Sequence, residues 1–104
     1  FEGKVGVDVS PEDAARAARQ SAINVLAVMK KELGALDNVK KIVKVTGYVA
    51  SAPGFTGQAG VINGASNLFF DVFGEEGRHA RAAVGVSELP LNAPVEVEIV
   101  AEII

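Results

Sequence analysis

The stretch that decides the fold is VKKIVKVTGYVA, residues 39–50, whose composition is typical of a β-strand. Read with a period of two, it places apolar residues and a glycine on one face and a mixed set on the other. The first face holds Val43, Val45, Gly47 and Val49. The second face holds Ile42, Lys44, Thr46 and Tyr48. The stretch therefore predicts a strand from Val39 to Ala50 with one side packed against other elements.

Two helices are predicted, one on each side of this strand in the chain. The first begins at Pro11, which suits the first helical position and follows Ser10, a good N-cap. It continues to about Leu33, where Gly34 ends it. Its apolar residues recur at three- and four-residue steps, at Ala15, Ala18, Ala22, Val25, Leu26, Met29 and Leu33. The second helix is expected over about 58–73. Both helices are predicted to be amphipathic, which suits them to packing on a sheet.

Three further strands complete the predicted order β-α-β-α-β-β. They are expected at residues 4–9, 80–86 and 95–104. Two helices and one mixed sheet form a natural pair of layers, so the predicted fold class is α+β. Residues 1–104 would form a single two-layer domain with both helices on one face of the sheet.

The apolar residues expected on the other face of the sheet are Ile42, Tyr48, Val100 and Ile104. They are too apolar to remain in water, so we expect burial against sister subunits.

Composition argues against several classes of protein and site. Apolar residues make up 49% of the chain, yet no stretch reaches the roughly 18 apolar residues of a membrane span. The chain has no Cys and one His, His79, which excludes disulfides and thiolate zinc sites and argues against a transition-metal site or a Ser-His-Asp triad. The formal net charge of −3 argues against nucleic-acid binding. The chain begins with Phe1 and shows no signal peptide, so we expect a cytoplasmic fragment or processed product.

The glycine series Gly54, Gly57 and Gly60 lies between a predicted strand and a predicted helix, where phosphate-binding loops are found. Its spacing matches neither the dinucleotide fingerprint nor a P-loop. A plain mobile loop is therefore the expectation.

Arg81 lies at the start of a predicted strand and carries the planar, permanently charged group that holds a carboxylate in two parallel hydrogen bonds. By spacing alone, it equally fits the solvated arginine that is common at strand ends. Glu96, Glu98 and Glu102 form the polar face of the last strand. If one of them lay near Arg81, it would orient a water as a general base. By the same spacing, His79 is an ordinary loop histidine.

Three motifs together resemble the Rid (reactive intermediate deaminase, or YjgF-like) family. More narrowly, they resemble the subgroup with a glycine-containing loop that is often labelled endoribonuclease L-PSP-like. The motifs are VASAPGFT (49–56), VINGAS (61–66) and GRHARAAVGV (77–86), followed by Leu89-Pro90 and the last strand. The resemblance extends over essentially all 104 residues. Members of that family carry further N-terminal strands, which this chain is expected to lack.

The resemblance implies a chorismate-mutase-like fold and a homotrimer with ligand clefts between subunits. It also implies hydrolysis of reactive enamines and imines, such as 2-aminoacrylate, to a 2-keto acid and ammonia, with no cofactor and no metal. By position, Arg81 matches the arginine that clamps the substrate carboxylate, and Glu96 matches the glutamate that helps to position the attacking water. Asn63 matches an asparagine on the second helix. Ala83 stands where many members have Cys, which leaves a backbone N–H for the substrate.

Two alternatives stay open at this point. One is a non-catalytic trimer that binds small carboxylate metabolites through Arg81. The other is a ribonuclease-type translation inhibitor, a function attached to some members of the family. The negative net charge and the low aromatic content of 6% give the second alternative little support.

Overall fold

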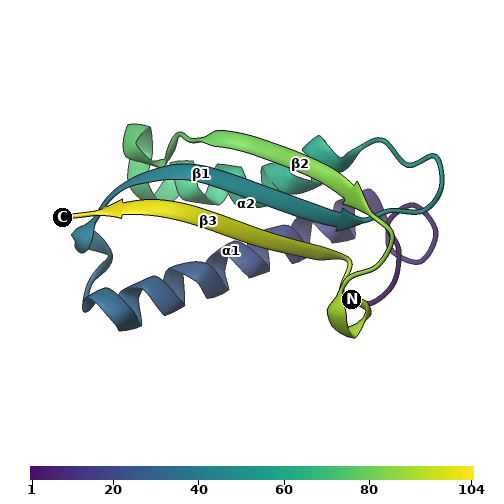
Figure 1. The fold of residues 1–104 in the computed structure, drawn as a ribbon, viewed down its shortest axis with the longest axis horizontal. Coiled ribbons are helices and arrows are strands. Elements are labelled where there is room, and N and C mark those ends of the chain that lie inside the picture. Colours follow the sequence, from purple (N-terminus) through teal and green to yellow (C-terminus); the bar gives the residue numbers. More distant parts are fainter.

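The computed structural model describes all residues, 1–104, as two helices packed on a three-stranded sheet (Figure 1). The long elements are α1 (Pro11–Leu33), β1 (Val39–Ala50), α2 (Gln58–Phe73), β2 (Ala80–Val86) and β3 (Val95–Ile103). Three short 3-10 turns connect them, at η1 (Leu36–Asn38), η2 (Gly74–Gly77) and η3 (Pro90–Asn92). These bounds confirm the predicted helices and the three strands that follow α1.

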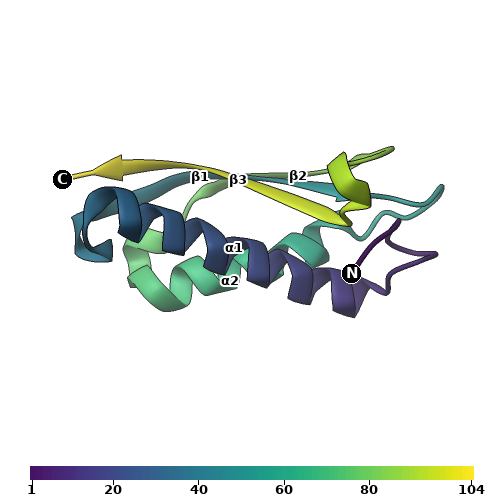
Figure 2. The same ribbon diagram turned by 90° about the horizontal axis from the view of Figure 1, so that it is seen from below.

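β1 is the central strand of the sheet, whose order is β2-β1-β3. It pairs in parallel with β2 and antiparallel with β3. Both helices lie against the same face of this sheet, as the edge-on view shows (Figure 2). The predicted α+β class, with a mixed sheet and two helices on one side, is therefore confirmed. Neither helix is both long and apolar enough to span a bilayer.

The core lies between the helices and the sheet, and two glycines allow the layers to approach closely. The largest side chains fully buried there are Phe69, Ile42 and Ile62. A Cβ atom on Gly47 of β1 would collide with Ile62 of α2, and one on Gly64 of α2 would collide with the backbone carbonyl of Ala15 in α1. Because the helices and the sheet are in contact at these points, α2 is fixed in its rotation about its own axis.

The segment from Lys4 to Val9 is not the strand that its alternation predicts. Gly3 and Gly6 adopt left-handed φ angles of 108° and 101°, which fold the segment into a turn. The Gly6 N–H donates to the Val9 carbonyl at 2.9 Å. Val5 forms only isolated bridges, one to Val9 within the segment and one to Ser51, which follows β1. The sheet of this chain consequently begins at β1, and the order is α-β-α-β-β.

Ile42 points toward the helices and is fully buried, so the prediction that it faces away from them is wrong. The pairing of β1 with β3 shifts register twice, between Val39 and Lys41 and between Ile42 and Lys44. Each shift inserts one extra residue, which turns the following side chains to the opposite face. Val43, predicted to face the helices, is accordingly 43% exposed.

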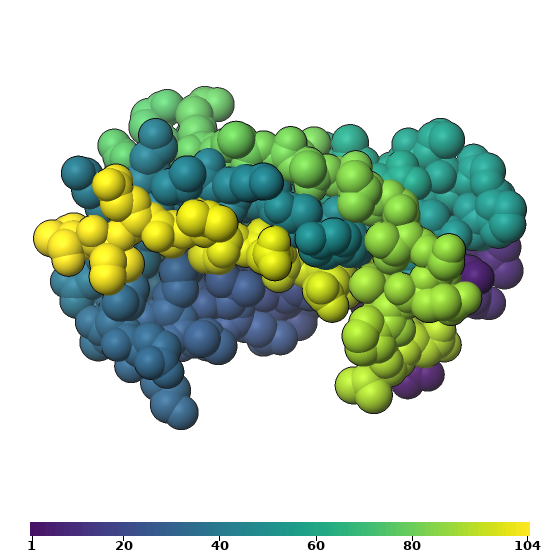
Figure 3. All heavy atoms as spheres, viewed as in Figure 1, coloured from purple at the N-terminus to yellow at the C-terminus, as the bar shows by residue number.

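The second face of the sheet is open to solvent in the single chain. Figure 3 shows this side, with β2, β1 and β3 next to one another and no helix over them. Val84 and Val100 are 43% and 53% exposed there, and Tyr48 is half-buried. Ile104 follows the end of β3 and is also exposed. The apolar character predicted for this face is thus present at Tyr48, Val84 and Val100.

Candidate functional site

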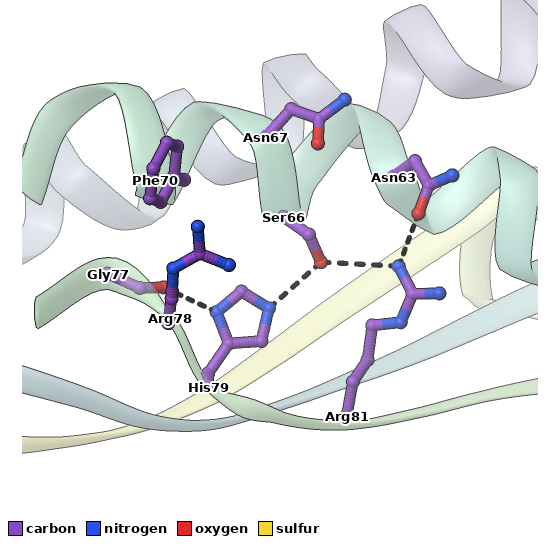
Figure 4. Close-up of a pocket in the computed structure, with 8 residues that line it drawn as sticks. All are labelled: Asn63, Ser66, Asn67, Phe70, Gly77, Arg78, His79 and Arg81. Carbon is purple, nitrogen blue, oxygen red and sulfur yellow. Dashed lines mark hydrogen bonds between the residues drawn. The ribbon is translucent and has the colours of Figure 1, made fainter. Parts of the chain in front are cut away.

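One face of α2 and the start of β2 together line an open pocket of about 400 Å³ (Figure 4). Its α2 wall consists of side chains three and four residues apart, at Asn63, Ser66, Asn67 and Phe70. Its other wall consists of Gly77, Arg78, His79 and Arg81. Seven of these eight residues are not hydrophobic, so the pocket is suited to a polar ligand.

Arg81 lies on the helix-facing side of the sheet, because it pairs with Val45, which is fully buried under the helices. Its Nη1 donates to Oδ1 of Asn63 at 2.6 Å and to Oγ of Ser66 at 3.4 Å. Its Nε and Nη2 make no hydrogen bond within the chain. These two nitrogens form the edge of the guanidinium that can hold a carboxylate in two parallel hydrogen bonds.

A chain of hydrogen bonds continues from Arg81 through Ser66 and His79 to the backbone (Figure 4). Nδ1 of His79 lies 2.6 Å from the Gly77 carbonyl oxygen, which can only accept, so Nδ1 carries a proton. Nε2 of a neutral imidazole then accepts from the Ser66 hydroxyl at 2.9 Å. The ring edge also meets Phe69 of the core, with centroids 6.1 Å apart. His79 therefore fixes the Ser66 hydroxyl, which in turn accepts from Arg81.

Arg78 is the second guanidinium of the pocket and is held by two contacts of its own. Its Nε donates to Oε2 of Glu75 at 2.9 Å, and its Cζ lies 4.5 Å from the centroid of the Phe70 ring. The terminal nitrogens of Arg78 make no hydrogen bond within the chain. Since no carboxylate lines the pocket, Arg78 and Arg81 give it a positive potential.

The structure brings two of the sequence-predicted residues into contact, keeps a third, Ala83, on the same strand as Arg81, and separates Glu96 from them. Asn63 and Arg81 are hydrogen-bonded, whereas Glu96 pairs with Tyr48 on the open face of the sheet. Two strand spacings and three residues along the strands put the Cα atoms of Arg81 and Glu96 roughly 14 Å apart. Ala83 lies two residues after Arg81, with its side chain half-buried against the core. The catalytic role of Glu96 therefore stays a prediction.

Sequence reasoning missed the contributions of Ser66, Asn67 and Arg78, and it read His79 as an ordinary loop residue. A signal for the first two is present in α2, where polar residues at 63, 66 and 67 interrupt a mostly apolar helix. The glycines at 54, 57 and 60 do not line the pocket. No group of three or more His, Asp or Glu side chains is arranged to hold a metal ion.

Comparison with known proteins gives consistent results. The family model described as Endoribonuclease L-PSP matches residues 1–103. The protein TCP17 of Trypanosoma cruzi is 48% identical over 102 residues, which cover 97% of this chain and 64% of that protein. Among solved structures, Atu1372 of Agrobacterium tumefaciens, a protein of unknown function, superposes with a TM-score of 0.97 at 51% identity, covering 99% of this chain and 66% of that one.

A proposed endoribonuclease of Shewanella oneidensis superposes with a TM-score of 0.95 at 29% identity, covering 99% of this chain and 68% of that one. The chain thus spans slightly less than two thirds of the length of TCP17 and Atu1372. The match to the family model extends over nearly every residue and agrees with the motifs around Asn63 and Arg81. The chain belongs to the endoribonuclease L-PSP family, the YjgF-like family that its sequence resembles.

Proposed function

We propose that Arg81 binds the carboxylate of a small 2-oxo or 2-imino acid, and that the protein hydrolyses reactive enamine and imine intermediates of the 2-aminoacrylate type. The observation that carries this proposal is the orientation of Arg81. Asn63 and Ser66 hold Nη1 and leave the Nε and Nη2 edge for a ligand. Arg81 is exposed, but these two partners on α2 restrict the orientation of its guanidinium. Its guanidinium is therefore preorganised to hold a planar carboxylate.

The reaction needs little from the protein beyond positioning. 2-Aminoacrylate takes a proton from solvent at C3 and becomes the iminium form of 2-iminopropanoate. Water then adds to its C2 carbon, a proton moves from the added water to the nitrogen, the carbon–nitrogen bond breaks, and pyruvate and ammonium leave. Arg81 would fix the carboxylate next to C2, and holding water close to so reactive a carbon supplies much of the rate.

Glu96 would contribute from a sister subunit in this proposal. Within one chain it lies on the opposite face of the sheet from Arg81, so a carboxylate that orients water beside Arg81 must come from another copy. The exposed apolar residues Val84 and Val100, together with Tyr48 beside Val84, favour contact between copies on the same open face that carries Glu96. A cytoplasmic homotrimer with clefts between subunits is the assembly that we propose.

The second candidate is a non-catalytic binder of small carboxylate metabolites. It is favoured by the lining of the pocket, which contains no carboxylate to activate water. It shares the role of Arg81 with the first proposal and differs only in turnover.

Turnover measurements separate the two candidates. 2-Aminoacrylate is generated in situ, and pyruvate release is followed with the parent, Arg81→Gln and Glu96→Gln chains. Enamine hydrolysis predicts faster release with the parent than with buffer and a loss of most of the acceleration in Arg81→Gln. Release no faster than in buffer, combined with saturable pyruvate binding that needs Arg81, would establish the binder instead.

A further inference from the structure

We propose that Ser66 and His79 form a nucleophile–base pair, and that the pocket hydrolyses esters of small acids through an acyl group carried on Ser66. This activity is separate from the proposed imine hydrolysis, because it needs no ligand on the Nε and Nη2 edge of Arg81. Ser66 comes from α2 and His79 from the segment just before β2, and both line the same open pocket. Figure 4 shows the two side chains pointing toward each other.

The hydroxyl of Ser66 is directed at an imidazole and not at its own helix. Its Oγ lies 2.9 Å from Nε2 of His79. Serines inside helices often donate to the carbonyl one turn earlier, as Ser21 of α1 does to Ala17 at 3.0 Å. Ser66 makes no such bond, so its proton is available to the ring. A hydroxyl within hydrogen-bond reach of an oriented base is the arrangement that activates a serine as a nucleophile.

The ring of His79 is fixed in the tautomer that a base needs. Nδ1 lies 2.6 Å from the Gly77 carbonyl oxygen, so the proton is on Nδ1 and the lone pair of Nε2 faces Ser66. The edge-to-face contact with the buried Phe69 ring, at 6.1 Å and 87°, supports this orientation. In a Ser-His-Asp triad the acid orients the imidazole. Here a backbone carbonyl has that role, in a pocket that no carboxylate lines.

A positive charge lies next to the hydroxyl, where negative charge develops during acyl transfer. Nη1 of Arg81 is 3.4 Å from Oγ of Ser66, and Asn63 holds this nitrogen from the other side at 2.6 Å. A donor that is already oriented beside the reacting oxygen stabilises the oxyanion of a tetrahedral intermediate. The pocket is open, polar and about 400 Å³ in volume, so it admits a small ester together with water.

The proposed reaction has two steps. In the first, Oγ of Ser66 attacks the ester carbonyl carbon while its proton passes to Nε2 of His79. The bond from that carbon to the alcohol oxygen then breaks, and the alcohol leaves with the proton from Nε2. In the second step, water attacks the acyl carbon and gives a proton to Nε2. The bond to Oγ breaks, Oγ takes the proton back, and the free acid leaves.

Labelling with a fluorophosphonate tests the pair. A serine displaces fluoride from this reagent and forms a stable phosphonyl ester when a base takes up its proton. The parent should be labelled at Ser66, as mapped by mass spectrometry of its peptides, and Ser66→Ala should stay unlabelled. His79→Gln should react about a hundredfold more slowly. Ser21→Ala is the matched control, since Ser21 is also a half-buried helical serine but lies outside the pocket, and it should react as the parent does. A parent that takes up no label at Ser66, or a His79→Gln variant labelled as fast as the parent, would overturn the proposal.

Hydrolysis of p-nitrophenyl acetate tests the activity itself. The parent should release p-nitrophenolate about a hundredfold faster than Ser66→Ala, the lower end of the range for general-base assistance, because the pocket is open to solvent. Replacing both Ser66 and His79 should cost no more than replacing Ser66 alone, since the two act as a unit. Urea unfolding checks that each variant is folded, and labelling of the parent needs no variant. A Ser66→Ala chain as fast as the parent would exclude ester hydrolysis by this pair and leave the proposed role of Arg81 untouched.

Discussion

The hydrogen bond between Asn63 and Arg81 makes a quantitative prediction about ligand binding. Replacing Asn63 with Ala removes the 2.6 Å contact that orients Nη1 and leaves only the longer 3.4 Å contact to Ser66. Hydrogen bonds to charged groups contribute about 1.5–3 kcal/mol. Both side chains here are exposed, so we take about 1 kcal/mol after allowing for screening by solvent. Without this contact, Arg81 should adopt the orientation that binds a carboxylate about five times less often, so the Kd of pyruvate should rise about fivefold.

The assay is calorimetric titration of pyruvate into parent and variant chains, together with urea denaturation. Asn63 makes no core contact, and the higher helix propensity of Ala offsets much of the lost hydrogen bond, so the free energy of unfolding should change by less than about 0.5 kcal/mol. Asn24→Ala is the matched control. Asn24 is also an exposed helical asparagine whose Oδ1 accepts a hydrogen bond, there from Gln20 at 3.0 Å. A Kd unchanged in Asn63→Ala, or raised equally in Asn24→Ala, would refute the positioning role.

Three other outcomes are expected from the packing and hydrogen bonds. Long-range nitrogen–proton correlation spectra of His79, the chain's single histidine, should show the Nδ1–H tautomer in the parent protein. Ser66→Ala should change the Nε2 signal, because Nε2 loses its hydrogen-bond donor. An Nε2–H tautomer in the parent would contradict the hydrogen-bond chain. Gly64→Ala should lower the free energy of unfolding in urea by about 1–3 kcal/mol because its Cβ meets a carbonyl of α1, whereas Gly60→Ala, with open space around it, should raise stability by up to about 1 kcal/mol. Ile42→Ala should lower the free energy of unfolding by about 2–5 kcal/mol in the same assay. A loss of less than about 1 kcal/mol would contradict the burial of Ile42 under the helices.

The positions of the helices could be predicted from local chemistry. The Ser10 hydroxyl accepts from the Asp13 N–H at 3.1 Å, as its N-cap position predicts, and the Gly34 N–H closes the end of α1 on the Lys30 carbonyl. Such signals act over a few residues, so one sequence is enough to read them. The same is true of α2, which ends at Gly74.

The faces of β1 could not be read with a single period. Val39, Ile42 and Val45 are buried at intervals of three, with lysines at 40, 41 and 44 between them. This spacing is the trace of two bulges, but a bulge becomes visible only when the partner strand β3 is known. The segment at 4–9 failed for a related reason, because alternation describes a strand and a glycine turn equally well over six residues.

Only part of the candidate site could be predicted from the sequence. The motifs around Asn63 and Arg81 identify two residues that the structure joins. The contact from Ser66 to His79 depends on how α2 is rotated over β2, which is set by the close approaches at Gly47 and Gly64. The separation of Glu96 from Arg81 depends on the strand order, and local patterns along the chain do not contain that order.

The most direct test of the role of Arg81 is an NMR titration of the arginine Nε–H signals with pyruvate. A carboxylate bound to the Nε and Nη2 edge should shift the Arg81 signal saturably, because its Nε–H becomes a charge-assisted donor. The signals of Arg16 and Arg19, which lie on α1 outside the pocket, should not move. An Arg81 signal that stays in place at saturating pyruvate, or one that moves no more than those of Arg16 and Arg19, would contradict the assignment of Arg81 as the carboxylate anchor.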